Sequence, residues 1–366
     1  MLIGMRILYG VTGEGMGHAM RSRVVLDALA AKHEIRVVVS GRAADYLAQR
    51  GSEVLSVRKI HGYTLAYEDN QLLKWRTVVQ NLKSALKGLP KNIYAYVDMA
   101  EEFKPDVVIT DFESWSYLFG LRHELPIISI DNMQIINRCE HAAEVLAGCK
   151  RDFRLTNAVV KAKIPGAFHY HITTFFYPPT RKPHTTLHPP ILRPEILAAR
   201  PESGRHLLVY QTSTSNKALP EILKRSGREC RIYGLRRDIK SEVVDGNLRY
   251  RPFSEAGFIE DLRTAAGVVA SAGFTLMGEA VYLRRPMLAV PVAGQFEQVL
   301  NARYLQRDGY GLAAGEISDT RLRQFIEALP EFERNLGRYR QDGNRDLLES
   351  LDRTLAAAVG RQHPRS

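Results

Sequence analysis

The feature that most constrains the fold is an alternation of short apolar runs and helical patterns that occurs twice along the chain. In the first half, apolar runs such as Arg6–Val11, Glu34–Ser40 and Asp106–Thr110 are separated by segments with helical periodicity. The alternation starts again at His206–Thr212 and continues to Gly311–Ala314. Continuous apolar strands between helices are typical of parallel sheets covered on both faces. The pattern predicts an α/β chain with two doubly wound, Rossmann-like domains that face a cleft.

The proline-rich segment Tyr177–Pro194 (YPPTRKPHTTLHPPILRP) lies between the two alternations and has the composition of an extended connector. We therefore predict a first domain over residues 1–185 and a second over residues 186–345. Residues 346–366 form an amphipathic helix with a basic tail. Packing back onto the first domain is one arrangement open to this helix.

Composition limits the class of protein and its partners. Hydrophobic residues make up 45% of the chain and charged residues 25%, as in soluble globular proteins. No apolar run approaches the roughly 18–20 residues that span a bilayer, and the opening MLIGMRILYG is too short for a signal peptide. Three scattered cysteines without metal-type spacing fit a reducing cytoplasm. The net charge of +11 suits nucleic acid, an anionic membrane or a phosphorylated substrate, but no nucleic-acid-binding motif accompanies it, so we expect no nucleic acid.

A glycine-rich stretch, GVTGEGMGHAMRS, follows the first apolar run and allows three interpretations. A dinucleotide loop needs G-x-G-x-x-G, and the stretch is one residue short of it, although Arg42 could favour the 2′-phosphate of NADP. A tight turn with an incidental histidine is the second. In the third, the glycines let an acceptor approach the backbone while His18 serves as a general base. The acceptor-side loop would then comprise Gly13, Glu14, Gly15, Met16 and Gly17.

A more specific pattern lies between Val268 and Gly311. There, an apolar run ends in a small-residue turn, and Thr275 opens a helical segment. Free N–H groups at a helix start form a site for a diphosphate. Glu279 comes one turn later, where its carboxylate could accept hydrogen bonds from ribose hydroxyls. Capping by Thr275 and a solvated Glu279 are the plain alternatives, but the ordered combination favours a binding site.

This segment resembles the donor-binding half of GT-B glycosyltransferases, particularly the UDP-glycosyltransferases and the N-acetylglucosaminyltransferase that forms lipid II. The opening glycine turn that ends in His18 resembles the same families. The resemblance implies a GT-B fold and a UDP- or dTDP-linked sugar as co-substrate, with no further cofactor. It assigns the diphosphate to Ser271, Ala272, Gly273, Phe274 and Thr275, the ribose to Glu279, the base to Phe253, and the sugar to Gln295, Glu297 and Gln298. The chain departs from plant-type members at Ser271-Ala272-Gly273, where they have His-Cys-Gly, and it lacks their base-stacking tryptophan.

The resemblance also implies metal-independent, inverting sugar transfer, and the chain has no DxD-type metal motif. His18 is the first candidate base. Asp111, at the end of the run DVVIT, could orient the histidine or act as the base itself. Thr212 and Ser213 end another apolar run and could reach a phosphate.

Two rival functions share these features: a nucleotide-sugar 2-epimerase on the same fold and a non-catalytic nucleotide-binding protein. The acceptor is open between a small molecule, a glycan and a lipid-linked compound. Leu72–Val97 mixes apolar residues with lysines. That composition fits a peripheral contact with the inner face of the membrane, and it equally fits an ordinary amphipathic surface helix.

Overall fold

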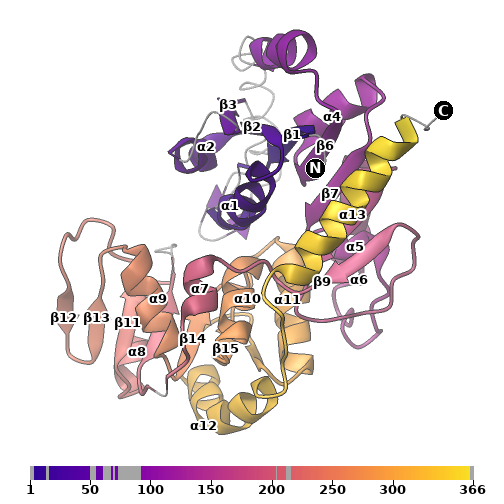
Figure 1. Cartoon of the computed structure of the whole chain (residues 1–366). Coiled ribbons are helices and arrows are strands. Elements are labelled where there is room, and N and C mark those ends of the chain that lie inside the picture. The colour runs from indigo at the N-terminus through magenta and orange to yellow at the C-terminus, as the bar shows by residue number, and fades with distance from the viewer. Residues whose placement is uncertain are drawn as a thin grey trace. The chain divides into compact units, whose positions relative to one another are not determined.

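The structure is a computed structural model, shown in Figure 1. It divides into two compact units, and the C-terminal segment belongs to the first of them. The first unit comprises Met1–Ala66, Leu73–Arg193 and Asp342–Ser366, and the second comprises Tyr67–Leu72 and Pro194–Gln341. The structure describes residues 4–13, 16–49, 55–60, 67–68, 71–72, 92–202, 204–211 and 216–362.

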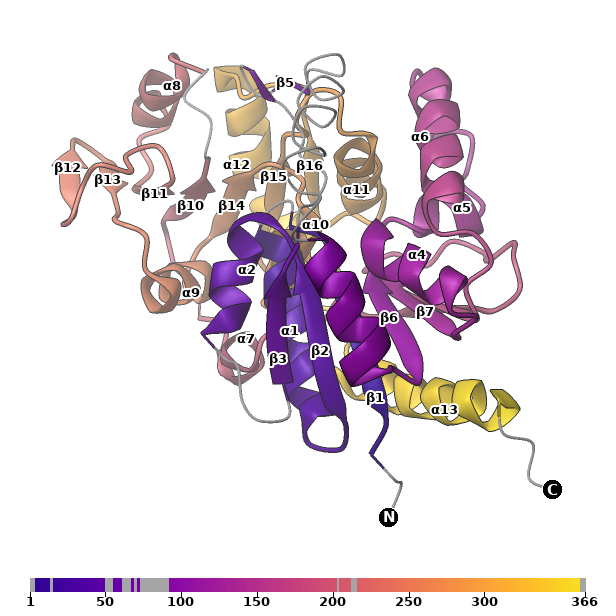
Figure 2. The ribbon, with the colours of Figure 1, turned by 90° about the horizontal axis from the view of Figure 1, so that it is seen from above.

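The first unit contains a parallel sheet of seven strands within the described residues, and Figure 2 shows its strands from β3 to β7 side by side. Their order is β3 (Leu55–Lys59), β2 (Glu34–Val39), β1 (Arg6–Val11), β6 (Val107–Asp111), β7 (Ile127–Asp131), β8 (His169–Thr173) and β9 (Thr185–His188). The central strands are continuous apolar runs because helices cover both faces of the sheet. The helical elements are α1 (Met16–Ala30), α2 (Gly41–Ala48), the π-helix η1 (Asp98–Phe103), α4 (Ser114–Arg122), α5 (Ile135–Arg138), α6 (Lys150–Lys163) and α13 (Arg345–Gln362).

The second unit repeats this plan over its described residues. Its strands are ordered β12 (Val243–Asp245), β13 (Leu248–Tyr250), β11 (Cys230–Tyr233), β10 (Leu207–Tyr210), β14 (Gly267–Ala270), β15 (Met287–Ala289) and β16 (Gly311–Ala313), all parallel except β12. A short hairpin pairs β4 (Tyr67–Glu68) with β5 (Gln71–Leu72). The helices are α7 (Pro194–Ala198), α8 (Leu219–Arg225), α9 (Glu255–Arg263), α10 (Phe274–Tyr282), α11 (Phe296–Arg307) and α12 (Asp319–Leu336).

Each unit has its own apolar core. In the first unit, Leu347, Leu351 and Leu355 of α13 are buried together with the strands and with α1. Helix α13 packs against β6 and β8, as Figure 1 shows in yellow. The amphipathic spacing of these leucines explains the docking, because it places one apolar face toward the sheet. Residues that are distant in sequence thus share one core.

The proline-rich segment does more than connect. We predicted Tyr177–Pro194 as an extended connector, yet it contains β9, the edge strand of the first sheet, which pairs with β8. Its prolines flank the strand and lie outside Thr185–His188, as expected for residues that cannot donate to a ladder. The first unit accordingly continues to Arg193.

The strand orders define one switch point in each sheet. In the first sheet the order reverses between β1 and β6, and in the second between β10 and β14. Ligands of doubly wound sheets bind outside the carboxyl ends of the strands at such points. The segments that follow these four strands are therefore the places to look for a site, and they carry His18, Asp111 and the turn Ser271–Thr275.

Candidate active site

His18 and Asp111 meet at the switch point of the first sheet. Asp111 is the last residue of β6 and lies opposite Val11, the last residue of β1. His18 lies in the first turn of α1, which follows β1. Its Nδ1 is 3.0 Å from Asp111 Oδ1, and the side chains are 20% and 1% exposed, respectively. The fold thus brings together the predicted base and its predicted partner from positions 93 residues apart in sequence.

Arg21 is a third member of this group and was not predicted from the sequence. Its Nε donates to Asp111 Oδ2 at 3.0 Å and its Nη2 donates to Oδ1 at 2.5 Å, so the guanidinium binds the carboxylate in a bidentate manner. Ser22 Oγ adds a bond to Oδ2 at 3.1 Å, and Arg21 Nη1 donates to Asn132 Oδ1 at 2.6 Å. The available signal was the His-x-x-Arg spacing, which puts both side chains on one face of α1.

Arg21 and Asp111 favour different tautomers of His18. Arg21 Nη2 lies 2.8 Å from His18 Nδ1. A guanidinium only donates, so this contact favours a lone pair on Nδ1. The Asp111 carboxylate only accepts, so its contact favours a proton on the same atom. The proton must be on Nδ1 if Nε2 is to act as the base, and Asp111 is the group that selects this tautomer.

The charges of the group follow from burial and proximity. Burial alone would raise the pKa of Asp111, but Arg21 and then His18 hold that pKa well below its usual value. Burial lowers the pKa of His18, and the Arg21 charge lowers it further, against the opposing effect of Asp111. His18 is therefore a neutral imidazole at neutral pH, the form that can accept a proton.

The loop that precedes His18 is only partly described. Met16 and Gly17 form the start of α1, while Glu14 and Gly15 lie outside the described residues. A Cβ at Gly13 would lie 2.1 Å from Ser40 O, so this glycine lets the ends of β1 and β2 approach each other. The predicted contribution of this loop to an acceptor site stays a prediction.

The predicted diphosphate turn lies at the switch point of the second sheet. Ser271 and Ala272 follow β14, and Gly273 is the N-cap of α10 without a side-chain capping bond. A Cβ built at Gly273 would meet nothing within 4 Å, so open space adjoins this helix start. Phe274 and Thr275 are its first two residues, with backbone N–H groups of the kind that bind anions.

Helix α11 supports this turn through Asn301. The Asn301 Nδ2 donates to Ala272 O at 3.2 Å and to Glu297 Oε1 at 2.5 Å. Gln298 is buried: its Oε1 accepts from the Val292 amide at 2.9 Å, and its Nε2 donates to Gln295 Oε1 at 2.5 Å. Gln298 thus fastens the segment before α11, whereas Gln295 and Glu297 are half-buried. Glu279 is buried on α10, one turn beyond Thr275.

Phe253 is an exposed aromatic residue of the second unit, between β13 and α9. Its side chain is 66% exposed, and its ring centroid lies 6.5 Å from that of Phe258 in α9. The predicted phosphate residues Thr212 and Ser213, which follow β10, lie outside the described residues.

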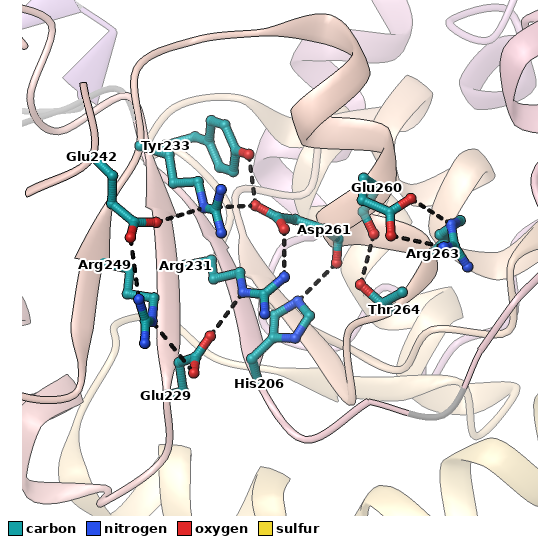
Figure 3. A network of polar contacts seen from close by, with 11 residues as sticks. His206, Glu229, Arg231, Tyr233, Glu242, Arg249, Glu260, Asp261, Arg263 and Thr264 are labelled. Carbon is teal, nitrogen blue, oxygen red and sulfur yellow. Dashed lines mark hydrogen bonds and ion pairs between the residues drawn. The ribbon is translucent and has the colours of Figure 1, made fainter. Parts of the chain in front are cut away.

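A buried charge network holds α9 against β11 and β13 (Figure 3). Asp261 accepts hydrogen bonds from Arg231 Nη1 and from the Tyr233 hydroxyl, each at 2.6 Å. Arg251 Nε lies 3.1 Å from Asp261 Oδ2. Since Arg251 precedes Phe253 by two residues, the network anchors the segment that presents this ring.

The described residues contain no group of three histidine, cysteine or acidic side chains arranged to hold a metal ion. None of the helices described in the structure is long and apolar enough to cross a membrane. Among the described residues, Cys139, Cys149 and Cys230 are buried and are not joined in disulfides.

Known proteins resemble this chain over most of its length. The sequence pattern of glycosyl transferase family 1 matches residues 5–330. An uncharacterized glycosyltransferase of Methanosarcina mazei is 23% identical over 338 residues, covering 84% of this chain and 85% of the relative. A relative from Bacillus thuringiensis, named UDP-N-acetylglucosamine–N-acetylmuramyl-(pentapeptide) pyrophosphoryl-undecaprenol N-acetylglucosamine transferase 1, is 38% identical over 88 residues, covering 23% of this chain and 24% of the relative.

The fold has solved counterparts. The structure of LpCGTa in complex with UDP has a TM-score of 0.64 and 13% identity, covering 96% of this chain and 99% of LpCGTa. The predicted resemblance to GT-B glycosyltransferases is confirmed, since the family pattern spans most of the chain and both relatives are named as transferases. The chain belongs to glycosyl transferase family 1 and is a glycosyltransferase with the GT-B fold.

Proposed function

We propose that this enzyme transfers a sugar from a UDP- or dTDP-linked donor to a hydroxyl group of an acceptor, with inversion and without a metal ion. One observation carries the proposal: the hydrogen-bonded group of the partly exposed His18 with the buried Asp111 and Arg21, at the switch point of the first sheet. It supplies a neutral imidazole that is oriented by an ionised carboxylate. This is the arrangement that general-base activation of a hydroxyl requires.

In the proposed reaction the acceptor hydroxyl donates its proton to His18 Nε2 as its oxygen attacks the anomeric carbon. The new bond joins the acceptor oxygen to that carbon, and the bond from the carbon to the diphosphate oxygen breaks. A single displacement from the opposite face inverts the configuration. Asp111 stabilises the imidazolium that forms, and because Arg21 holds Asp111 ionised, we assign Asp111 the orienting role and His18 the role of the base.

The second unit is proposed to bind the donor. The open helix start at Ser271–Thr275 suits a diphosphate, and Glu279 on the same helix suits the ribose. Phe253 offers an exposed ring for the base. Gln295 and Glu297 are assigned to the sugar, with Gln298 holding Gln295 in place. The UDP complex of a protein with the same fold and the UDP-N-acetylglucosamine in the Bacillus relative's name support a uridine donor.

The proposal of a metal-independent reaction rests on how the leaving diphosphate can be stabilised without a cation. Backbone N–H groups and the positive end of α10 can offset charge on the departing diphosphate. Relatives that are named as transferases favour transfer over the epimerase alternative. The acceptor class stays open between small molecules, glycans and lipid-linked compounds.

A cytoplasmic protein with a peripheral membrane contact is part of the same proposal. The predicted contact, Leu72–Val97, lies mostly outside the described residues. Its described end exposes Ile93, Tyr94 and Val97. Exposed apolar side chains at the end of a lysine-containing segment are compatible with an interfacial contact.

The experiment is a thermal unfolding screen against nucleotide sugars in excess EDTA, followed by turnover of each hit. Binding to the native state raises the unfolding midpoint. We expect a uridine or thymidine diphosphate sugar to give the largest rise, and we expect EDTA to change neither binding nor turnover. Turnover that disappears with the chelator and returns with magnesium or manganese would contradict the metal-independent mechanism.

A further inference from the structure

Four cationic side chains gather in the first unit around the end of α5, away from any carboxylate partner. They are Arg138, Lys161, Arg181 and Lys182. Arg138 ends α5, Lys161 lies in the last turn of α6, and the other two precede β9. This cation cluster takes no part in the proposed transfer step.

A buried asparagine holds two of the cations side by side. Arg181 donates from Nε and Nη2 to Asn137 O at 3.1 and 2.9 Å, respectively. Lys182 Nζ donates to the side-chain Oδ1 of the same residue at 2.5 Å. Asn137 is 4% exposed and also donates to Gln134 Oε1. The positions of both cations are therefore fixed by the protein.

Arg138 lies beside them and is also held by contacts with the protein. Its guanidinium lies 3.6 Å above the centre of the Tyr170 ring and donates to Thr185 Oγ1 and Pro183 O. Each of these partners is neutral. Within the described part of the chain, none of the four cations forms an ion pair, and the acid that acts on Arg138 from a distance is the buried Asp131.

The cations also act on one another. Burial lowers the pKa of Lys182, and the charges of Arg138, Arg181 and Lys161 lower it further. Like charges that are held together without a counterion destabilise the fold, so such a cluster is stabilised by any anion that enters it. Arg181 and Lys161 are exposed, which leaves the cluster open to solvent.

We infer that the cation cluster is a binding site for a phosphate group. A phosphate oxyanion matches guanidinium donors in geometry and takes a lysine as a further point charge. The site is near the proposed catalytic group along the chain. Asn132 binds Arg21 Nη1, and the five residue steps from Asn132 to Asn137 cannot span more than about 18 Å. The phosphate would belong either to a soluble ligand, such as the acceptor, or to a lipid headgroup.

The test measures the unfolding midpoint against inorganic phosphate at constant ionic strength, with chloride as the reference anion. Phosphate should stabilise the wild type more than chloride does. Lys182→Gln keeps an N–H donor for Asn137 but removes the charge, and it should weaken phosphate binding about tenfold. Lys150→Gln removes an exposed charge from the start of α6 and should bind phosphate like the wild type.

The same variants exclude a purely structural role. If the cations repel one another, Lys182→Gln without phosphate should unfold at the wild-type temperature or above it. If Lys182 only caps α5, this variant should unfold at a lower temperature and respond to phosphate like the wild type, which would overturn the inference. Equal stabilisation of the wild type by phosphate and chloride would overturn it as well.

Vesicle sedimentation identifies the source of the phosphate. Binding to phosphatidylglycerol vesicles but not to phosphatidylcholine vesicles, with loss in Lys182→Gln, would assign the site to a lipid headgroup. Phosphate binding without vesicle binding would assign it to a soluble phosphorylated ligand. Neither assay requires a nucleotide sugar or turnover, so failure of the proposed transfer reaction would leave this result intact.

Discussion

Each unit of the enzyme contains an aspartate that is almost completely buried and hydrogen-bonded to an arginine. In the first unit, Asp111 accepts two hydrogen bonds from Arg21. In the second, Asp261 accepts one from Arg231 and lies against Arg251 as well. Both side chains are at most 3% exposed. Burial of an ion pair therefore does not distinguish a catalytic carboxylate from a structural one.

The difference lies in position and in the third partner. Asp111 ends a strand at the switch point and contacts His18, a titratable group that is partly exposed. Asp261 lies within α9 and contacts Tyr233, whose pKa is raised by burial first and then by this carboxylate. Tyr233 stays protonated at neutral pH and cannot act as a base. Under the proposed function, the position at a strand end and the contact with His18 distinguish Asp111 from the structural Asp261.

The largest expected effect is on the stability of the second unit. In Asp261→Asn, Arg231 and Arg251 lose the buried carboxylate that they share, although Glu229 and Glu242 still pair with them. Because a hydrogen bond to a charged group contributes up to about 3 kcal/mol, unfolding should become easier by about 3 kcal/mol. Chemical denaturation measures this change. Turnover of the folded fraction should stay at the wild-type level, because Asp261 touches no reacting group.

The control is Asp238→Asn, which removes an exposed partner of Arg236 in the same unit. It should leave the denaturation midpoint unchanged. If Asp261→Asn were as stable as this control, or if it lowered turnover of folded enzyme, the division between structural and catalytic aspartates would be wrong.

The next effect concerns donor binding. Glu279→Ala should weaken nucleotide-sugar affinity roughly 10- to 150-fold, because a hydrogen bond to a charged group contributes about 1.5–3 kcal/mol. Calorimetry on folded protein measures it. Glu327→Ala, an exposed substitution on α12, is the control and should bind like the wild type. Unchanged affinity in Glu279→Ala would remove this residue from the donor site.

The smallest effect is on the pH profile of kcat/KM. His18 must be neutral to act, so activity is lost as pH falls through its lowered pKa, below the ordinary value of 6.5. Arg21→Gln removes the larger of the two charges that lower the pKa of His18, while burial and the charge of Lys163 remain. The pKa of His18 should rise, and the acid limb should move to higher pH.

Arg23→Gln provides the matched control for this shift. Arg23 is a buried arginine on the same helix, and its Nη1 donates to Tyr46 instead of Asp111. The acid limb should stay in place in this variant. An acid limb that moved to lower pH in Arg21→Gln would contradict the assignment of His18 as the titrating base.

The sequence predicted the fold well, because apolar strands between helices leave little choice of architecture. It predicted Asp111 at the end of a strand and His18 at the start of a helix, and the structure has both there, at the switch point where doubly wound sheets bind ligands. Their catalytic roles stay predictions. Arg21 escaped notice because its partner is 90 residues away and a helical arginine usually faces solvent. The edge strand β9 was not predicted, because the prolines that flank it are typical of an extended connector.

The proposed sugar-binding residues show a second limit of sequence. Gln295, Glu297 and Gln298 form one polar cluster in the sequence, with nothing to separate their roles. Packing separates them, since Gln298 is buried and bonded to Val292 and Gln295. Which side chain of a polar cluster supports the others depends on tertiary contacts that the local pattern does not contain.

The central claim is that His18 activates the acceptor while the other unit holds the donor. Donor affinity and turnover should be measured on one preparation of His18→Ala, with His123→Ala, an exposed histidine of the same unit, as the control. The account predicts that turnover falls about 10²-fold or more while donor affinity is unchanged, and that the control matches the wild type. Turnover close to the wild-type level in His18→Ala would contradict it.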